Sequence, residues 1–180
     1  MKKKPEILNR TVLAQSRLFD IESVHLRFSN GQERHFERIA GRNPSSVMVV
    51  PMPDEKTVLL IREYGAGVED YVLAFPKGAV EGDEDIFSTA LRELKEEVGY
   101  GARKFEKIGQ FSASPGYLGS MMQVVLATDL YHEPMPGDEP EPMEVVPWKL
   151  DAIDPLIAHP EFHEARSIAA LLMLERLRRG

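Results

Sequence analysis

Glutamates cluster near the middle of the chain, and their spacing suits metal chemistry. Within residues 78–100, here called the glutamate motif, Glu93, Glu96 and Glu97 follow Arg92 closely. On an α-helix these three carboxylates fan over roughly 100° of one face. Like charges this close repel one another. A hard divalent cation such as Mg²⁺ or Mn²⁺ prefers oxygen ligands and relieves that repulsion.

A solvated acidic helix face is the competing interpretation. In that arrangement Arg92 bridges to Glu96 at i+4 spacing and water screens the remaining charges. From the helix pattern alone this is the commoner case. The residues around the helix are therefore needed to choose between a metal site and a solvated acidic face.

The same stretch carries signals for where a helix begins and ends. Asp83 or Asp85 can cap its N-terminus, and Gly99 can end it in a left-handed conformation. We expect the carboxylates to lie on a face beside the core-facing stripe. The predicted stripe consists of Ile86, Phe87, Ala90, Leu91, Leu94 and Val98.

Taken whole, the glutamate motif resembles the Nudix box, Gly-x5-Glu-x7-Arg-Glu-U-x-Glu-Glu-x-Gly-U, where U is a bulky apolar residue. The fixed positions are occupied by Gly78, Glu84, Arg92, Glu93, Glu96, Glu97 and Gly99. Tyr100 is a mild departure at the last position. The resemblance implies an α/β Nudix fold, an α/β/α sandwich with a mixed sheet. It also implies metal-dependent hydrolysis of a nucleoside diphosphate linked to another moiety.

The resemblance further implies roles for single residues. The expected cation ligands are Glu93, Glu97, Glu96 and the backbone carbonyl of Lys77. The expected supporting residues, which hold the loop and the ligands in place, are Gly78, Glu84, Arg92 and Gly99. Glu96 is also a candidate catalytic residue.

An acidic, proline-rich loop spans residues 133–144. Composition alone describes a solvated loop. In ADP-ribose hydrolases of the Nudix family a mobile loop at this place supplies a glutamate, which acts as general base or as a further metal ligand. The resemblance therefore makes Glu141 the first candidate for this role and Glu139 the second.

Pro115 narrows the expected substrate class. It follows Gly99 at a distance that resembles the marker of ADP-ribose-type Nudix hydrolases, although Ser114-Pro115-Gly116 is also an ordinary turn sequence. The resemblance implies ADP-ribose, diadenosine triphosphate and NADH as substrates and AMP as the shared product. One alternative is another substrate, such as a nucleotide sugar or CoA. A second alternative is a non-catalytic nucleotide-binding domain, against which the retained glutamates argue.

The chain departs from its relatives at two places. Related hydrolases often have a Glu where this chain has Ala74. They also often have Gln-Tyr-Arg where it has Glu63-Tyr64-Gly65, so the Arg that touches substrate in those relatives is missing. Arg38 and Arg62 are the candidate replacements, because a guanidinium binds phosphate through a two-pronged fork. Both arginines could equally form ordinary surface ion pairs. Pro115 is the third candidate for substrate binding.

Residues 6–40 predict a separate β unit. Apolar and polar residues alternate from Phe19 to Phe28, Ser29-Asn30-Gly31 is a hairpin turn, and residues 32–39 return as the partner strand. We expect a unit at 1–43 and a hydrolase domain at 44–180. So small a sheet is not stable alone and must pack on the main domain or on a second subunit. The resemblance implies that it exchanges across a homodimer.

The remaining elements follow from apolar runs. Strands are predicted at residues 46–51, 57–62, 68–75, 107–112 and 123–130, and a helix at 161–179. The residues of this helix predicted to face inward are Phe162, Ala165, Ile168, Ala169, Leu172 and Leu177.

Composition limits the class of protein. The 180 residues include no cysteine, which excludes disulfides and thiolate chemistry. A net charge of −7 argues against nonspecific binding to nucleic acid or membranes. The basic start at Lys2–Lys4 lacks the apolar run of a secretory signal, and no run is long enough to span a bilayer. We therefore expect a cytoplasmic location.

Overall fold

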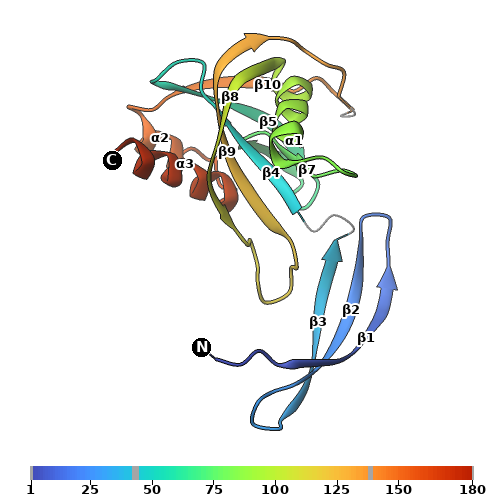
Figure 1. Cartoon of the computed structure of the whole chain (residues 1–180). Helices are drawn as coiled ribbons and strands as arrows, with labels where there is room; N and C mark the ends of the chain where they lie inside the picture. The colour runs from blue at the N-terminus through green and yellow to red at the C-terminus, as the bar shows by residue number, and fades with distance from the viewer. Residues whose placement is uncertain (1, 42–44, 138–139, 180) are drawn as a thin grey trace. The chain divides into compact units, whose positions relative to one another are not determined.

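The computed structural model describes residues 2–41, 45–137 and 140–179 and divides into two compact units (Figure 1). The first unit comprises Met1–Pro44 and Ser112–Met121, and the second comprises Ser45–Phe111 and Met122–Gly180. The expected boundary at residues 43 and 44 lies outside the described residues and stays a prediction.

The first unit is a three-stranded antiparallel sheet. Its strands β1 (Glu6–Gln15), β2 (Phe19–Arg27) and β3 (Glu33–Gly41) lie in the order β1-β2-β3. Gly31 turns the predicted hairpin at a φ of 80°, a conformation that favours glycine. Ile39 of β3 also donates a backbone hydrogen bond of 2.7 Å to the carbonyl of Tyr117. The segment that contains Pro115 therefore belongs to this unit.

The described residues of the second unit form two sheets and four helical elements. The strands are β4 (Ser45–Pro51), β5 (Thr57–Gly65), β6 (Asp70–Ala74), β7 (Lys77–Ala79), β8 (Tyr100–Phe111), β9 (Met121–His132) and β10 (Glu144–Lys149). They form one sheet of order β7-β4-β9-β8 and a second of order β10-β5-β6. The helical elements are α1 (Ile86–Glu93), the π-helix η1 (Leu94–Val98), α2 (Ile153–Ile157) and α3 (Ala165–Arg178).

Strands β4 and β5 separate two hydrophobic cores. Successive side chains of a strand point to opposite faces. Val47 and Val49 of β4 accordingly pack in a cluster with Leu94 of η1, whereas Met48 and Val50 pack in a cluster with residues of α2 and α3. Figure 1 shows α1 on one side of these strands and α2 with α3 on the other. The predicted α/β/α sandwich is confirmed.

The inward face of the C-terminal helix differs from the prediction. Leu172 and Leu177 were expected in the core but are 51% and 45% exposed. The side chains of α3 that are buried belong to Ser167, Ala170, Leu171 and Leu174. Residues 168–174 are all apolar, so their spacing cannot select one face of the helix. None of the helices in the described part of the chain is long and apolar enough to cross a membrane.

The predicted strands also require correction. β8 begins at Tyr100, directly after the glutamate motif, and not at residue 107, because its first half is too polar to stand out in the sequence. β1 and β7 were not predicted as strands, and neither was β10. β10 contains Pro147 and lies at the edge of its sheet, where a strand tolerates proline.

A buried serine joins α3 to the chain that enters the glutamate motif. Ser167 is fully buried, and its hydroxyl donates a hydrogen bond of 2.6 Å to the Glu164 carboxylate. The same Oγ accepts a 3.0 Å bond from the backbone N–H of Phe75, which follows β6 and precedes Pro76 and Lys77. Glu164 also caps α3 by accepting the Ser167 N–H. This contact fixes the end of β6.

We predict that Ser167→Ala lowers the free energy of unfolding by about 1–3 kcal/mol, because it leaves the buried Phe75 N–H without an acceptor. Urea denaturation measures the change. Ser88→Ala is the matched control, since its exposed hydroxyl makes only a 3.3 Å bond to Asp85. That control should change stability by no more than about 0.5 kcal/mol. Equal effects of the two substitutions would contradict the role given to Ser167.

Candidate functional site

The helix of the glutamate motif begins and ends at two predicted residues. The Asp85 carboxylate accepts backbone hydrogen bonds from Phe87 at 2.8 Å and Ser88 at 3.0 Å, so it is the N-cap. Gly99 ends the helix with a φ of 80° and donates its N–H to the carbonyl of Leu94. Between them the helix widens from α to π at Leu94, a change that the sequence did not predict and that is frequent at functional sites.

Two of the motif glutamates are part of the buried helix face. Glu93 is 7% exposed and Glu97 is 6% exposed, as deep as neighbouring core residues. Phe87, by contrast, was predicted for the core stripe and is 41% exposed. The carboxylates therefore replace part of the predicted stripe. This burial argues against the solvated acidic face, because isolated buried carboxylates are costly unless they are paired or bind a metal.

Gly78 allows the first of these carboxylates to approach the backbone. A Cβ atom at this position would lie 1.8 Å from Oε1 of Glu93, closer than real side chains ever come. Any other residue at this position would require the Glu93 carboxylate to move. This contact gives a physical reason for glycine at the start of the motif.

Arg92 connects three glutamates. Its Nε donates to Glu84 at 3.0 Å, and one terminal nitrogen donates to Glu93 at 2.7 Å and to Glu96 at 3.0 Å. The other terminal nitrogen reaches the carbonyl of Ala79 at 3.1 Å. The hydrogen bond from Arg92 holds the pKa of Glu84 below its ordinary value, which keeps that carboxyl ionised. The Arg92–Glu96 pair of the competing interpretation is thus present, but within a larger network.

Glu97 is bound to the residue before Gly78. Its Oε2 accepts a 2.9 Å hydrogen bond from the backbone N–H of Lys77. Burial raises the pKa of Glu97 to about 8, the positive charge of Lys77 opposes that rise, and the negative charge of Glu93 adds to it. A cation beside Glu97 would therefore stabilise its ionised form.

These donors can be tested against a divalent cation. Within the described residues, no three acidic or histidine side chains converge closely enough to hold a metal ion by themselves. Arg92 holds Glu93 and Glu96, and the Lys77 N–H holds Glu97. All the predicted donors are oxygens, and two of them are buried carboxylates. This chemistry fits a hard divalent cation, while the ligand set of Glu93, Glu96, Glu97 and the Lys77 carbonyl stays a prediction.

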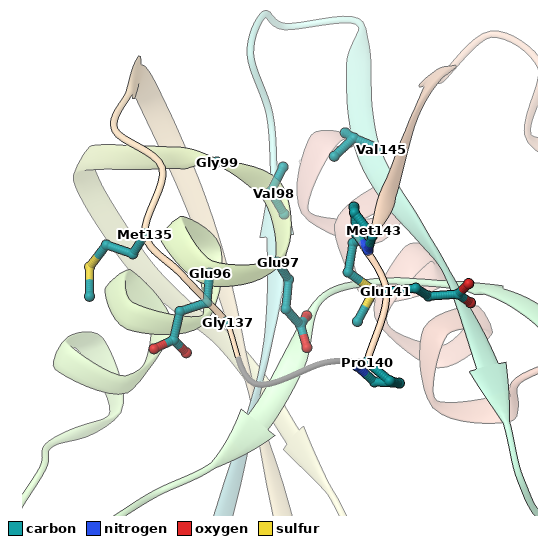
Figure 2. Close-up of a pocket in the computed structure, with 11 residues that line it drawn as sticks. Glu96, Glu97, Val98, Gly99, Met135, Gly137, Pro140, Glu141, Met143 and Val145 are labelled. Carbon is teal, nitrogen blue, oxygen red and sulfur yellow. The ribbon is translucent and has the colours of Figure 1, made fainter.

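A cavity of 440 Å³ lies at the C-terminal end of the motif helix (Figure 2). Its lining includes Glu96 and Glu97 on one side and Glu141 of the acidic loop on the other. In Figure 2 these three carboxylates point in different directions. That of Glu141 accepts a 2.6 Å hydrogen bond from the Tyr71 hydroxyl. Glu139 lies outside the described residues, so the choice between the two loop glutamates stays open.

Arg62 faces away from the glutamate motif. On β5 it follows Ile61, whose side chain packs in the cluster that contains Leu94 of η1, so Arg62 points to the opposite face of the strand. Its guanidinium pairs with Glu144 and, at 3.0 Å, with Glu161. These contacts match the ion-pair interpretation of Arg62.

Arg38 and Pro115 come together in the first unit. Both line a cavity of 320 Å³ within that unit. Arg38 also pairs with Glu22 of the neighbouring strand at 2.7 Å. Their part in substrate binding stays a prediction.

Sequence reasoning missed Glu63 as a site residue. Its carboxylate lies 2.8 Å from Nζ of Lys77, and its charge contributes to the raised pKa of Glu97. Glu63 follows Ile61 by two positions on β5 and therefore shares its face. This alternation was visible in the sequence. A role for Glu63 could not be inferred from it without the position of Lys77 in the structure.

Comparison with known proteins assigns the chain to a family. The NUDIX domain matches residues 42–171, and a NudE-type Nudix hydrolase N-terminal domain matches residues 5–38. The chain belongs to the Nudix hydrolase family. It is thus an enzyme of the class that the glutamate motif predicts, and Nudix hydrolases require a divalent metal ion.

The chain resembles named Nudix hydrolases along almost its whole length. It is 45% identical to ADP compounds hydrolase NudE of Escherichia coli, over 98% of this chain and 95% of that protein. It is 29% identical to an ADP-ribose pyrophosphatase of Bacillus subtilis, over 93% of this chain and 94% of that protein. A crystal structure of an ADP compounds hydrolase matches with a TM-score of 0.92 and 44% identity, covering 100% of this chain and 97% of that one.

We predict that Arg92→Lys lowers kcat or the affinity for the divalent cation by about 10–100-fold. A lysine has one nitrogen and cannot bridge Glu84, Glu93 and Glu96 together. Steady-state kinetics and calorimetric titration with Mn²⁺ measure the loss. Arg103→Lys is the control, because Arg103 is exposed on β8 and, within the described residues, contacts only Asp129 and the ring of Tyr131, neither of which belongs to the glutamate motif. Wild-type values in Arg92→Lys would show that the network is dispensable.

We also predict that, with a chelator present, the stability of the enzyme falls as pH rises from about 4.5 to about 8. The carboxyl of Glu97 ionises at the ordinary value of 4.5 in the unfolded chain but only near pH 8 in the folded chain. Below this pH window Glu97 is protonated in both the folded and the unfolded chain, and above it Glu97 is ionised in both. The loss of stability therefore develops within the window. Denaturation at several pH values measures the slope. Glu97→Gln should remove this contribution, and an unchanged slope would refute it.

Proposed function

We propose that this Nudix hydrolase cleaves the diphosphate bond of ADP-containing compounds, namely ADP-ribose, diadenosine triphosphate and NADH, and releases AMP. The observation that carries the proposal is the 45% identity to an ADP compounds hydrolase over nearly the whole chain, N-terminal unit included. The buried carboxylates beside the 440 Å³ cavity supply a site for such chemistry.

The cation of this site is proposed to be Mg²⁺ or Mn²⁺, held by Glu93, Glu96, Glu97 and the Lys77 carbonyl. When bound, such an ion neutralises a diphosphate and lowers the pKa of a bound water. The chain itself supplies orientation. Arg92 fixes two of the glutamates, and the Lys77 N–H fixes the third. Phosphoryl transfer needs little else beyond positioning and charge stabilisation.

A loop glutamate is proposed to orient or deprotonate the attacking water. Glu141 lines the cavity and is the first candidate, with Glu139 as the second. The hydrogen bond between Glu141 and Tyr71 must break before this carboxylate can turn towards Glu97.

The enzyme is proposed to act as a homodimer through its first unit. The three-stranded sheet leaves several large apolar side chains 42–53% exposed: Ile7, Val12, Leu13, Phe19 and Phe36. A small sheet with this much apolar surface is stabilised by a partner. A cytoplasmic location without nucleic-acid or membrane partners remains our expectation from composition.

Product analysis tests the function directly. The enzyme is incubated with Mg²⁺ or Mn²⁺ and each of five compounds: ADP-ribose, diadenosine triphosphate, NADH, a nucleotide sugar and CoA. Release of AMP from the first three supports the proposal. Hydrolysis of only the nucleotide sugar or CoA would mean that the substrate class is not ADP-containing compounds of the proposed kind. No metal-dependent hydrolysis of any compound would favour a non-catalytic binding domain.

We predict that Glu97→Gln removes nearly all turnover of the preferred substrate while the substrate still binds. The amide keeps the shape of the side chain but cannot act as an anionic ligand. Kinetics and equilibrium binding of ADP-ribose separate the two effects. Glu106→Gln, at an exposed position of β8, is the control. A near-normal kcat for Glu97→Gln would reject the assignment.

A further inference from the structure

The site is rich in negative charge, although its proposed substrate is an anion. Glu93, Glu96 and Glu97 belong to the motif helix, and Glu63 contributes a fourth carboxylate from β5. Arg92 is already engaged by three glutamates and a backbone carbonyl. A cation that the protein itself positions would therefore assist the proposed metal ion in bringing a diphosphate beside these carboxylates.

Lys77 has the required placement. Its backbone N–H donates to Glu97, so its side chain starts from a residue in direct contact with one of the buried carboxylates. Its charge reaches Glu97 strongly enough to oppose the effect of burial on that carboxyl. The Lys77 side chain is 16% exposed, which keeps the ammonium close to the protein but accessible.

Glu63 gives this ammonium a fixed direction. The distance between Nζ and the Glu63 carboxylate is 2.8 Å. A lysine side chain is long and flexible, so a single partner restricts it considerably. An ammonium has three N–H donors, and among the described residues Glu63 is the one side chain that accepts from it. A diphosphate oxygen can thus join the ammonium without displacing Glu63.

Other cations of the second unit are less suitable. Arg62 lies on the opposite face of β5 and is paired with two carboxylates. Lys95 of η1 is held by Glu133 at 2.7 Å. Neither contacts Glu97 or Glu63 through any described hydrogen bond.

We propose that the Lys77 ammonium, aimed by Glu63, binds the diphosphate of the substrate. This inference rests on the proposed hydrolysis of ADP-containing compounds. Lys77 would thereby serve the site twice, through its backbone beside Glu97 and through its side chain at the substrate. Glu63 is a positioning residue that acts through Lys77.

The test compares Lys77→Met with Lys107→Met, a control at an exposed lysine of β8. ADP-ribose hydrolysis is measured with Mg²⁺ saturating for each variant, and circular dichroism melting checks folding. Lys77→Met should raise KM by at least about tenfold while kcat changes less, as loss of a charged hydrogen bond requires. Its KM should also depend less on salt than that of the wild type. Lys77→Arg should recover part of the loss, and Lys77→Gln replaces the Met variant if that one does not fold.

The role of Glu63 has its own test. Glu63→Gln should raise KM in the wild-type background and have no further effect in the Lys77→Met background, because the two residues act as a unit. A lower KM in Glu63→Gln would mean that Glu63 only neutralises the ammonium, which overturns the positioning role. Suppose that the wild type hydrolyses ADP-ribose. If Lys77→Met then has the same KM and the same salt dependence as the wild type, the whole inference is overturned. If the wild type hydrolyses none of the ADP compounds, the proposed function fails first.

Discussion

A single guanidinium organises the acidic half of this site. Arg92 extends from the motif helix back to Glu84 in the preceding loop and forward to Glu93 and Glu96 on its own helix. Without that positive charge, the glutamates would repel one another in a region with little access to water. The close approach of Glu93 to Gly78 belongs to the same arrangement, since Arg92 holds the carboxylate that lies against the loop. The loop and the helix are therefore folded as one electrostatic unit.

The ends of the motif helix and the N-terminal hairpin were predicted from local sequence signals. Asp85 and Gly99 mark the two ends of the helix by side-chain capping and by backbone conformation, and neither depends on the rest of the chain. The family resemblance then supplied the sandwich, because the spacing of the glutamates is far more specific than any apolar pattern. The hairpin at Gly31 was equally readable, since its turn needs a positive φ.

Features that depend on tertiary packing could not be predicted from the sequence. The burial of Glu93 and Glu97 could not be predicted from the sequence, because it results from the packing of β5 and β7 against the helix. The face of α3 could not be chosen within an unbroken apolar stretch, and Leu172 was misplaced as a result. Glu63 was noticed only as a departure from related sequences. Its meaning came from Lys77, a residue distant in sequence that the sheet brings to 2.8 Å.

The contact between Ser167 and Phe75 has a consequence for biosynthesis. Leu73 of β6 donates its N–H to the carbonyl of Glu161, and Phe75 donates to Ser167, so the segment leading into the glutamate motif is held by residues that come much later in the chain. During translation these partners leave the ribosome after the strands and the motif helix, because they follow them along the chain. A nascent chain can thus assemble most of its sheets early. It acquires a fully ordered site only after Glu161 and Ser167 have also left the ribosome, so the strands that lead into the motif wait for a later part of the chain.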